Sequence, residues 1–156
     1  MTANTKSRAT LLALYRTAVD TAHPRTCLPP RLPTVPAGGR IIVIGAGKAD
    51  AAMAVATEQH YAATGEIDRV GGFVTTRHGF ALPTTHLAII EAAHPVPDEA
   101  SVAGAARAIA AAKAATGKDL VLVLLSGGAS ALWSQPVDGV SFAAKQALTK
   151  QLLRAG

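Results

Sequence analysis

The residues with the clearest chemical potential lie in the stretch VIGAGKADAAMA, which runs from Val43 to Ala54. Gly45, Gly47 and Lys48 form a glycine-rich turn between an apolar run and a helical pattern. The first turn of a helix presents free backbone N–H groups and the positive end of the helix dipole, and both attract anions. A lysine there mildly opposes the dipole, which favours a functional role for it. The stretch therefore indicates an anion site; a solvated lysine on a tight turn is the alternative.

Two common phosphate-binding motifs do not fit this stretch. The dinucleotide fingerprint Gly-x-Gly-x-x-Gly/Ala has Asp50 in its third place, where a carboxylate would face the pyrophosphate. The strand expected at 71–79 also ends without the acid that would bind a ribose. The ATP-binding P-loop needs Ser or Thr after its lysine, but Ala49 follows Lys48. The sequence thus predicts an anion site of another type.

A second glycine-rich loop, LLSGGASALW, also follows an apolar run. Ser126, Gly127 and Gly128 would bring bare backbone to the end of a strand, and Ser130 adds a hydroxyl. Because ligands of parallel α/β sheets bind at the carboxyl ends of the strands, we expect this loop and the turn at 45–48 on one edge of one sheet. A glycine turn needed only for close packing is the alternative, although it explains the serines less well.

A third loop, AAHPVPDEAS, carries His94, which could bind a ligand, donate a proton to a substrate or hydrogen-bond a backbone carbonyl. Asp98 in the same loop is expected to cap the next helix rather than act as a base. Arg77 and His78 end the expected strand at 71–79, so either could reach the same crevice. No His, Cys and Asp residues have metal-ligand spacing, and no Gly-x-Ser-x-Gly elbow is present, so we predict neither a metal site nor a hydrolase triad.

The elements that must position these residues alternate between strands and helices. Continuous β-branched and leucine-rich runs predict strands that are buried on both faces of a parallel sheet. Expected helix boundaries are Asp98 and Ser141 as N-caps and Gly117 as a stop. The expected strands are 41–44, 71–79, 86–92 and 119–128, and the expected helices are 48–61, 97–117 and 141–156. The predicted fold is α/β: a Rossmann-like, doubly wound, mainly parallel sheet with helices on both faces.

The first 39 residues are predicted to be a separate segment. Residues 10–23 place Leu11, Leu14, Tyr15, Ala18 and Ala22 on one helical face, which predicts a helix draped over the domain. Five of the nine prolines fall within residues 23–39, which predicts an irregular linker with polyproline II character. We therefore divide the chain into a helix and linker, 1–39, and a Rossmann-like domain, 40–156.

Composition narrows the class of partner. The net charge is +5 and aromatic residues make up 4% of the chain, yet Lys and Arg are scattered, so an anionic small molecule is expected rather than nucleic acid. No apolar stretch approaches the length of a membrane span, so no membrane association is expected. The single cysteine, Cys27, cannot form an internal disulfide, which fits a reducing compartment and a cytoplasmic protein.

In their order and spacing, VIGAGKA, HPVPDEAS and LLSGGASALW resemble the N-terminal domain of the bacterial and archaeal glycerate 2-kinases. Those proteins have a domain of the DUF4147 type followed by a MOFRL domain, and some are labelled hydroxypyruvate reductase. The resemblance covers roughly residues 40–156. It implies ATP-dependent phosphorylation of D-glycerate to 2-phosphoglycerate with Mg²⁺. Lys48 falls on the family's motif lysine, and its other motif residues fall on Gly45, Gly47, His94, Ser126, Gly127, Gly128 and Ser130.

Two departures from the family pattern qualify this resemblance. Ala129 stands where the family usually has a third glycine, which would cost about 1 kcal/mol if that position needs a positive φ. The chain also stops before the MOFRL-type domain, so it corresponds to a truncated protein that is expected to be inactive alone. Its partner would be a separate C-terminal half or a second copy. A nicotinamide-dependent hydroxypyruvate reductase and a non-catalytic binding or assembly module remain the alternative functions.

Overall fold

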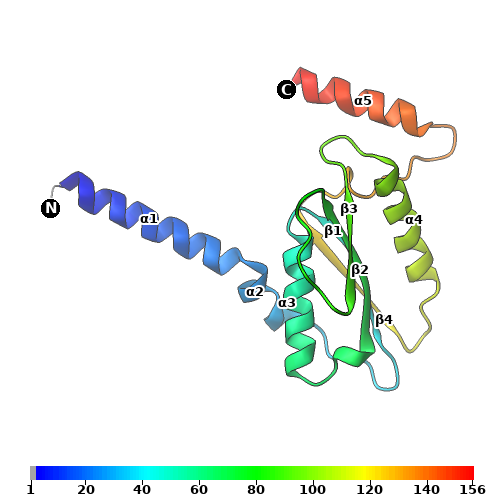
Figure 1. Cartoon of the computed structure of the whole chain (residues 1–156), viewed down its shortest axis with the longest axis horizontal. Coiled ribbons are helices and arrows are strands. Elements are labelled where there is room, and N and C mark those ends of the chain that lie inside the picture. The colour runs from blue at the N-terminus through cyan, green and yellow to red at the C-terminus, as the bar shows by residue number, and fades with distance from the viewer. Residues whose placement is uncertain (1–2) are drawn as a thin grey trace.

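The computed structural model describes residues 3–156 and shows a parallel α/β sheet with helices on both faces (Figure 1). The helices are α1 (Ala3–Ala22), α2 (Pro24–Cys27), α3 (Asp50–Ala63), α4 (Glu99–Lys113) and α5 (Phe142–Ala155). The strands are β1 (Ile41–Gly47), β2 (Val70–Arg77), β3 (Leu87–Ala92) and β4 (Leu120–Ser126). Two short 3-10 turns, η1 (Pro29–Arg31) and η2 (Ile67–Arg69), complete the order.

The four strands are parallel and lie in the order β3-β2-β1-β4. The chain therefore adds strands on one side of β1 and then crosses to its other side, which makes the gap between β1 and β4 the topological switch point. Ile41 pairs with Leu120 and Gly47 with Ser126, so the two strands end at the same level. Ligands of open parallel sheets bind beyond this point, at the carboxyl ends of the strands.

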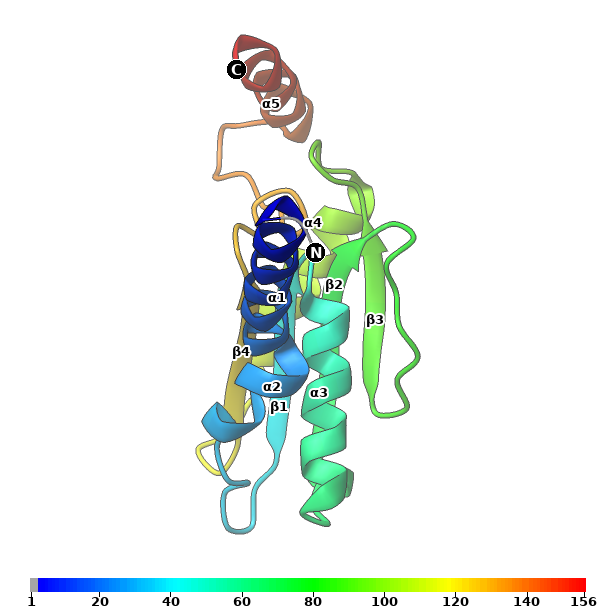
Figure 2. The same ribbon diagram turned by 90° about the vertical axis from the view of Figure 1, so that its left-hand side faces the viewer.

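Each face of the sheet has its own core. Residues of β1, β2 and β4 that alternate along the strands pack with Ala54 and Tyr61 of α3 on one face. Ile44 and Phe73 pack with Ala108 of α4 on the other face. Figure 2 shows α3 in front of the sheet and α4 behind it. The predicted Rossmann-like, doubly wound fold is therefore confirmed, and small alanine side chains let both helices lie close to the strands.

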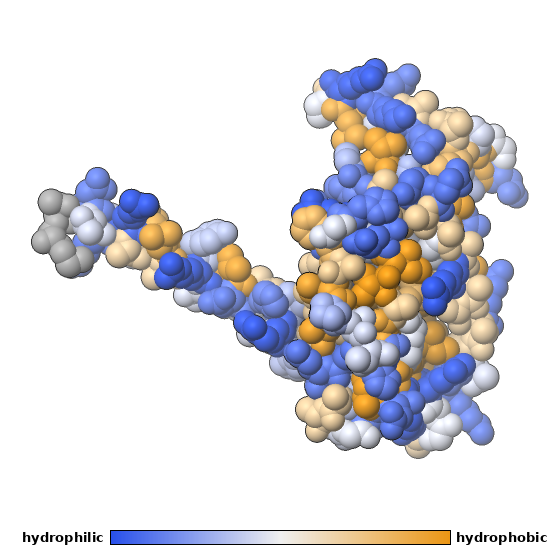
Figure 3. All heavy atoms as spheres, in the orientation of Figure 1, coloured by the Kyte–Doolittle hydropathy of each residue, from blue (hydrophilic) through white to orange (hydrophobic). Residues whose placement is uncertain are grey.

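The N-terminal helix does not lie on the domain, contrary to our expectation. Each residue of α1 from 4 to 22 is exposed, and the helix projects away from the body beyond α2 (Figure 1). Leu11 and Tyr15 of the predicted apolar face are 66% and 67% exposed. Apolar side chains of α1 are exposed, and the space-filling view shows some of them between hydrophilic residues (Figure 3). Periodicity predicted the helix correctly and its packing wrongly.

The proline-rich segment is more ordered than a polyproline linker. It contains α2 and η1, and the side chain of His23 accepts a hydrogen bond from the Arg25 N–H at the start of α2. The segment is also attached to the domain, because the hydroxyl of Tyr61 donates to the Pro33 carbonyl at 2.6 Å. Val35 is buried in the core under α3. The division of the chain at residue 39 stays a prediction.

Most predicted element boundaries are correct to within a few residues. Asp98 and Ser141 cap α4 and α5 by accepting backbone N–H groups of Ser101 and Ala144. Gly117 is not the stop of α4, because the helix ends at Lys113 and a turn held by the Asp119 carboxylate follows. The helix expected from Lys48 begins at Asp50, because β1 continues through Gly47.

The C-terminal helix and the outer strand leave apolar surface uncovered. No residue of α5 is buried, and the helix lies beyond the carboxyl edge of the sheet rather than on a face (Figure 1). Its Gln146 side chain donates to the Pro97 carbonyl at 2.8 Å. On β4, Val123 and Leu125 are 49% and 54% exposed. Within residues 3–156, no helix is both long and apolar enough to cross a lipid bilayer.

Candidate functional site

The two glycine-rich loops meet at the switch point, as expected from the sequence. β1 ends at Gly47 and β4 ends at Ser126, and these two residues are paired in the sheet. The Ala49 N–H donates to Oγ of Ser126 at 2.9 Å, so the start of α3 is joined directly to the end of β4. The turn at 45–48 and the loop at 126–130 therefore share one edge of the sheet, which is where the fold class binds its ligands.

Ser126 is the centre of this junction. Besides accepting from Ala49, its hydroxyl donates to Oδ1 of Asp50 at 2.5 Å. The hydroxyl proton and one lone pair are thus engaged inside the protein. The side chain of Ser126 therefore links β4 to α3. Its remaining lone pair can accept a hydrogen bond, but the hydroxyl has no further proton to donate. Any contact of this loop with an anion must therefore come from backbone N–H groups or from the Ser130 hydroxyl.

Asp50 is the polar residue whose role the sequence did not predict. Its side chain is fully buried, and Oδ2 has no hydrogen-bond partner. Burial raises the pKa of Asp50 from 3.8 to about 6, although hydrogen bonds from Ser126 act in the opposite direction. The sequence feature that could have indicated its role is its position in the third place of the dinucleotide fingerprint. The carboxylate does not face outward toward a ligand; it lies inside, under the turn.

Gly45 and Gly47 make room for this carboxylate. A Cβ at Gly45 would lie 2.7 Å from Oδ2 of Asp50 and 2.9 Å from the Leu124 carbonyl oxygen. A Cβ at Gly47 would lie 2.1 Å from Oγ of Ser126 and 2.5 Å from Oδ1 of Asp50. Both glycines are buried within β1. Close packing therefore requires them, whether or not an anion also binds above.

The second loop presents open backbone instead. Gly127 and Gly128 are exposed, and neither has an atom within 4 Å of where a Cβ would stand. Gly127 has a φ of 79°, a conformation that favours glycine. Ala129 has no positive φ, so the cost expected from its replacing a glycine does not arise. Ser130 is exposed in the turn that follows.

The loop is held down by two large side chains that follow it. Leu132 is fully buried beside Ala46 and Ala92. The indole N–H of Trp133 donates to Oγ1 of Thr75 at 3.1 Å, from β4's loop to β2. The N–H groups of both residues donate to the Ala129 carbonyl. The contacts of Leu132 and Trp133 therefore anchor the loop that carries the exposed glycines to the core.

Basic groups gather beside these loops. Lys48 is exposed directly after β1, and His94 is exposed two residues after β3. Burial lowers the pKa of His94, and the positive charges of Lys48 and Arg77 lower it further. The three groups are therefore close enough to act on one another electrostatically, which sequence reasoning could only suggest for Arg77. Three basic groups therefore gather at this edge of the sheet.

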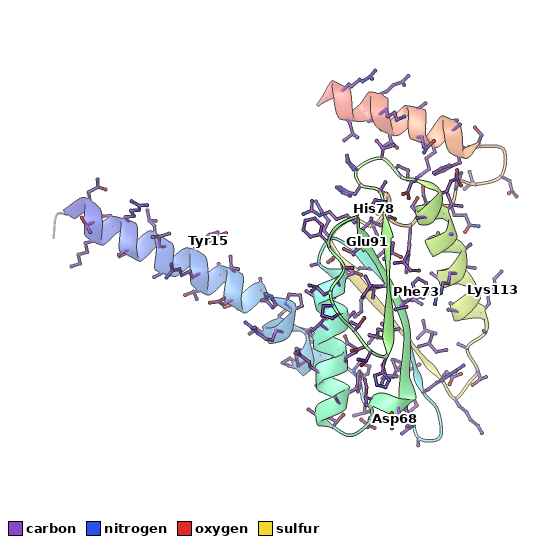
Figure 4. The ribbon with its side chains drawn as sticks, viewed as in Figure 1. Tyr15, Asp68, Phe73, His78, Glu91 and Lys113 are labelled. Carbon is purple, nitrogen blue, oxygen red and sulfur yellow. The ribbon has the colours of Figure 1, made fainter. Side chains whose placement is uncertain are left out.

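His78 lies at the same edge but is engaged with acids. Its Nε2 lies 3.2 Å from Oδ2 of Asp98, while Glu91 accepts the N–H groups of Phe80 and Ala81. Figure 4 shows His78 and Glu91 near the ends of β2 and β3. Asp98 is therefore a helix cap and a partner of His78, and the structure gives it no free position as a base.

A hollow of about 290 Å³ opens on the other side of the junction, between α2 and the end of β4. Its wall is mostly apolar and includes Leu28, Met53 and Leu125, and Ala49 and Ser126 also line it. Within residues 3–156, no group of three or more His, Cys, Asp or Glu side chains could hold a metal ion. The site as built offers backbone, hydroxyl and cationic groups, which are ligands for anions.

Comparisons with known proteins match this chain to one family model and to several relatives. Residues 10–156 match a protein-family model described as "Domain of unknown function (DUF4147)". A protein of Agrobacterium vitis named "Putative hydroxypyruvate reductase" is 41% identical over 150 residues, covering 96% of this chain and 33% of that protein. A glycerate 2-kinase of Pyrococcus horikoshii is 36% identical over 118 residues, covering 76% of this chain and 26% of that protein.

A solved structure gives the same result for the fold. The crystal structure of a glycerate kinase from Thermotoga maritima superposes with a TM-score of 0.76 at 30% identity, over 97% of this chain and 36% of that chain. The present chain thus spans about a third of the length of the relatives it matches.

Proposed function

Because this chain belongs to the DUF4147 family, we propose that it forms part of a glycerate 2-kinase, which transfers the γ-phosphoryl group of ATP to D-glycerate. The observation that carries the proposal is the junction at the switch point. Two glycine-rich strand ends, an exposed lysine and an apolar hollow meet where nucleotide-binding α/β folds hold phosphate. The relatives named glycerate kinase support the choice of reaction.

Each group has a role that phosphoryl transfer requires. This reaction depends on positioning and on neutralising charge more than on covalent chemistry. The exposed backbone of Gly127 and Gly128, with the Ser130 hydroxyl, would hold phosphate oxygens. Lys48 would stabilise charge on the transferring group. Gly45 and Gly47 would fix the position of Lys48, because they allow β1 to pack on Asp50 and Ser126.

ATP and Mg²⁺ fit this donor set in different ways. The apolar hollow beside Ser126 suits the flat face of a nucleobase. The described residues provide no carboxylate cluster, and the Asp50 carboxylate is buried under β1, so Mg²⁺ would be held mainly by the phosphates of the nucleotide. When bound, the metal ion would neutralise phosphate charge. Among residues 3–156 we assign no side chain as the base that accepts the glycerate proton.

The alternative is an NAD(P)H-dependent hydroxypyruvate reductase, which the name of the Agrobacterium relative favours. The site supports it less well. The third place of the fingerprint holds Asp50, whose side chain fills the space between β1 and α3, and β2 ends in Arg77 rather than an acid for the ribose. A non-catalytic binding or assembly role is the third possibility, since the chain spans a third of its relatives.

One experiment separates these functions. The chain is joined to the remaining two-thirds of a relative, and ADP release on addition of D-glycerate is measured beside NADH oxidation on addition of hydroxypyruvate. We expect glycerate-dependent ADP release, and isothermal titration should show binding of ATP but not NADH. NADH oxidation without ADP release would contradict the kinase proposal, and binding without either reaction would favour the assembly role.

A further inference from the structure

Three basic residues follow the ends of three neighbouring strands. Lys48 follows β1, Arg77 is the last residue of β2, and His94 lies two residues beyond β3. Ala46 pairs with Thr75 across β1 and β2, and Arg77 pairs with Ala92 across β2 and β3. By this register Lys48 follows β1 at the level of Arg77, and His94 lies two residues beyond that level.

Side-chain alternation places Arg77 on the α4 face of the sheet. Ala46 and Ala92 both pack against Leu132, and Thr75 accepts from Trp133, so these three strand residues face the α4 side. Arg77 stands two positions beyond Thr75 in β2, so it faces the same side, because alternate residues of a strand share a face. Lys48 and His94 follow just beyond the ends of β1 and β3. The lowered pKa of His94, to which the charges of Lys48 and Arg77 contribute, independently indicates that the groups converge.

No acid of the described chain neutralises this group. The ion pairs within residues 3–156 are Arg40–Asp119, Arg69–Glu66 and His78–Asp98, and none includes Lys48, Arg77 or His94. Of the acids near this edge, Asp50 is buried and hydrogen-bonded to Ser126. Asp98 and Glu91 are occupied by His78 and by backbone N–H groups. Converging cations without a counter-charge are unfavourable unless an anion joins them.

Arg77 is the most constrained of the three. Its guanidinium carbon lies over the Phe80 ring, 3.5 Å from the ring centre. Its Nε is buried and has no hydrogen-bond partner. A guanidinium held in this way presents a planar fork of N–H donors, and that geometry matches the two oxygens of a carboxylate.

We propose that Arg77, together with Lys48 and His94, forms a subsite for the carboxylate of a small hydroxy acid, while the Gly127–Gly128 loop takes the phosphates of the nucleotide. The inference rests on the proposed function, because it takes glycerate as that acid. It divides the edge into two parts: the acid lies over β2 and β3, and the nucleotide lies over β1 and β4. Lys48, between them, stands where the phosphoryl group would pass from one to the other.

The test measures binding rather than turnover. D-glycerate, glycerol and ATP are titrated separately into the wild-type chain and into R77M, R77K and R107M, with binding followed by NMR chemical-shift changes. Arg107 is a matched control because it is exposed and also stacks on a phenylalanine, Phe73, at 4.5 Å. Thermal unfolding of each variant establishes that the fold is retained.

We expect R77M to bind glycerate at least about tenfold more weakly than wild type, with ATP affinity unchanged, because only the carboxylate contact is lost. The glycerate affinity of R77K should lie between those of wild type and R77M, and R107M should bind glycerate as tightly as wild type. Glycerol, which lacks the carboxylate, should not bind. Unchanged glycerate affinity in folded R77M, equal loss of glycerate and ATP, or no saturable glycerate binding by wild type would each overturn the subsite. A full-length hybrid that releases no ADP would contradict the proposed function and leave these affinities intact.

Discussion

The hydroxyl of Ser126 donates a hydrogen bond to Oδ1 of Asp50 at 2.5 Å and accepts one from the Ala49 N–H. Together these bonds join the end of β4 to the start of α3. Two segments 76 residues apart in the chain are joined in this way. The bond crosses the topological switch point, so it sets the relative position of the two glycine-rich loops. A buried carboxyl group and a serine therefore determine the geometry of the edge at which the ligand is proposed to bind.

Replacing Asp50 by Asn should remove a pH-dependent cost in stability. The folded pKa of about 6 lies above the unfolded value of 3.8, so the folded state binds more protons between these values and the stability of wild type falls as pH rises through them. Relative to D50N, wild type should lose up to about 3 kcal/mol of unfolding free energy between pH 4 and pH 7. Urea unfolding at a series of pH values measures this. D138N, which changes an exposed acid, is the control, and an equal pH slope in wild type and D50N would contradict the prediction.

Adding one methyl group at Gly47 should disrupt the junction. In G47A the new Cβ would overlap the Ser126 hydroxyl and the Asp50 carboxylate, so we expect a loss of more than about 3 kcal/mol of unfolding free energy. G117A is the matched control, because that glycine has open space and no positive φ, and its effect should stay within about 0.5 kcal/mol. Equal stability of the two variants would show that the edge adjusts freely.

Lys48 should matter for turnover and not for folding. In the full-length hybrid, K48A should lower the rate of glycerate phosphorylation at least about a hundredfold, because the lysine acts on charge in the transition state. Because the residue is exposed, unfolding free energy should change by less than about 0.5 kcal/mol. K113A, at the far end of α4, should keep normal turnover. Near-normal rates in K48A would show that Lys48 is a solvated residue with no role in turnover.

Anion binding should raise the pKa of His94. The pKa is lowered by burial and by the charges of Lys48 and Arg77, and an anion placed between these cations offsets their effect. The protein should therefore take up protons on binding, and affinity for glycerate should rise as pH falls through the pKa of the bound histidine. NMR titration of the imidazole with and without glycerate measures the change, with the ring signals of His60, near the other end of α3, as the control. An unchanged titration curve for His94 would show that the bound anion does not lie near this histidine.

The 156-residue chain alone should fold yet release little or no ADP with glycerate. Phosphoryl transfer requires both substrates in line with charge balanced around the γ-phosphate, and this chain spans about a third of its relatives. It should also self-associate, because apolar side chains of α1 and β4 are exposed. A coupled ADP assay and sedimentation measure the two properties. Robust turnover by the chain alone would show that the rest of the relatives' length is dispensable.

The sequence by itself determined the elements and their order. Continuous apolar runs predicted the strands, Asp98 and Ser141 predicted two helix starts, and the alternation of strands with helices predicted a parallel sheet. Because parallel strands expose their carboxyl ends on one edge, the sequence also placed both glycine-rich loops together. These features depend on local patterns and on a general rule of chain connection, so they can be read without coordinates.

Only the tertiary structure decided which side chains meet at these two loops. The contact of Asp50 with Ser126 depends on β4 lying beside β1, and no local pattern encodes strand order. The convergence of Arg77 with Lys48 and His94 likewise depends on strand register. The position of α1 was predicted wrongly for the same reason, since an amphipathic stripe shows that a helix has an apolar face but not what lies opposite it. Local propensity acts over a few residues, whereas the site is made by contacts between residues far apart in the chain.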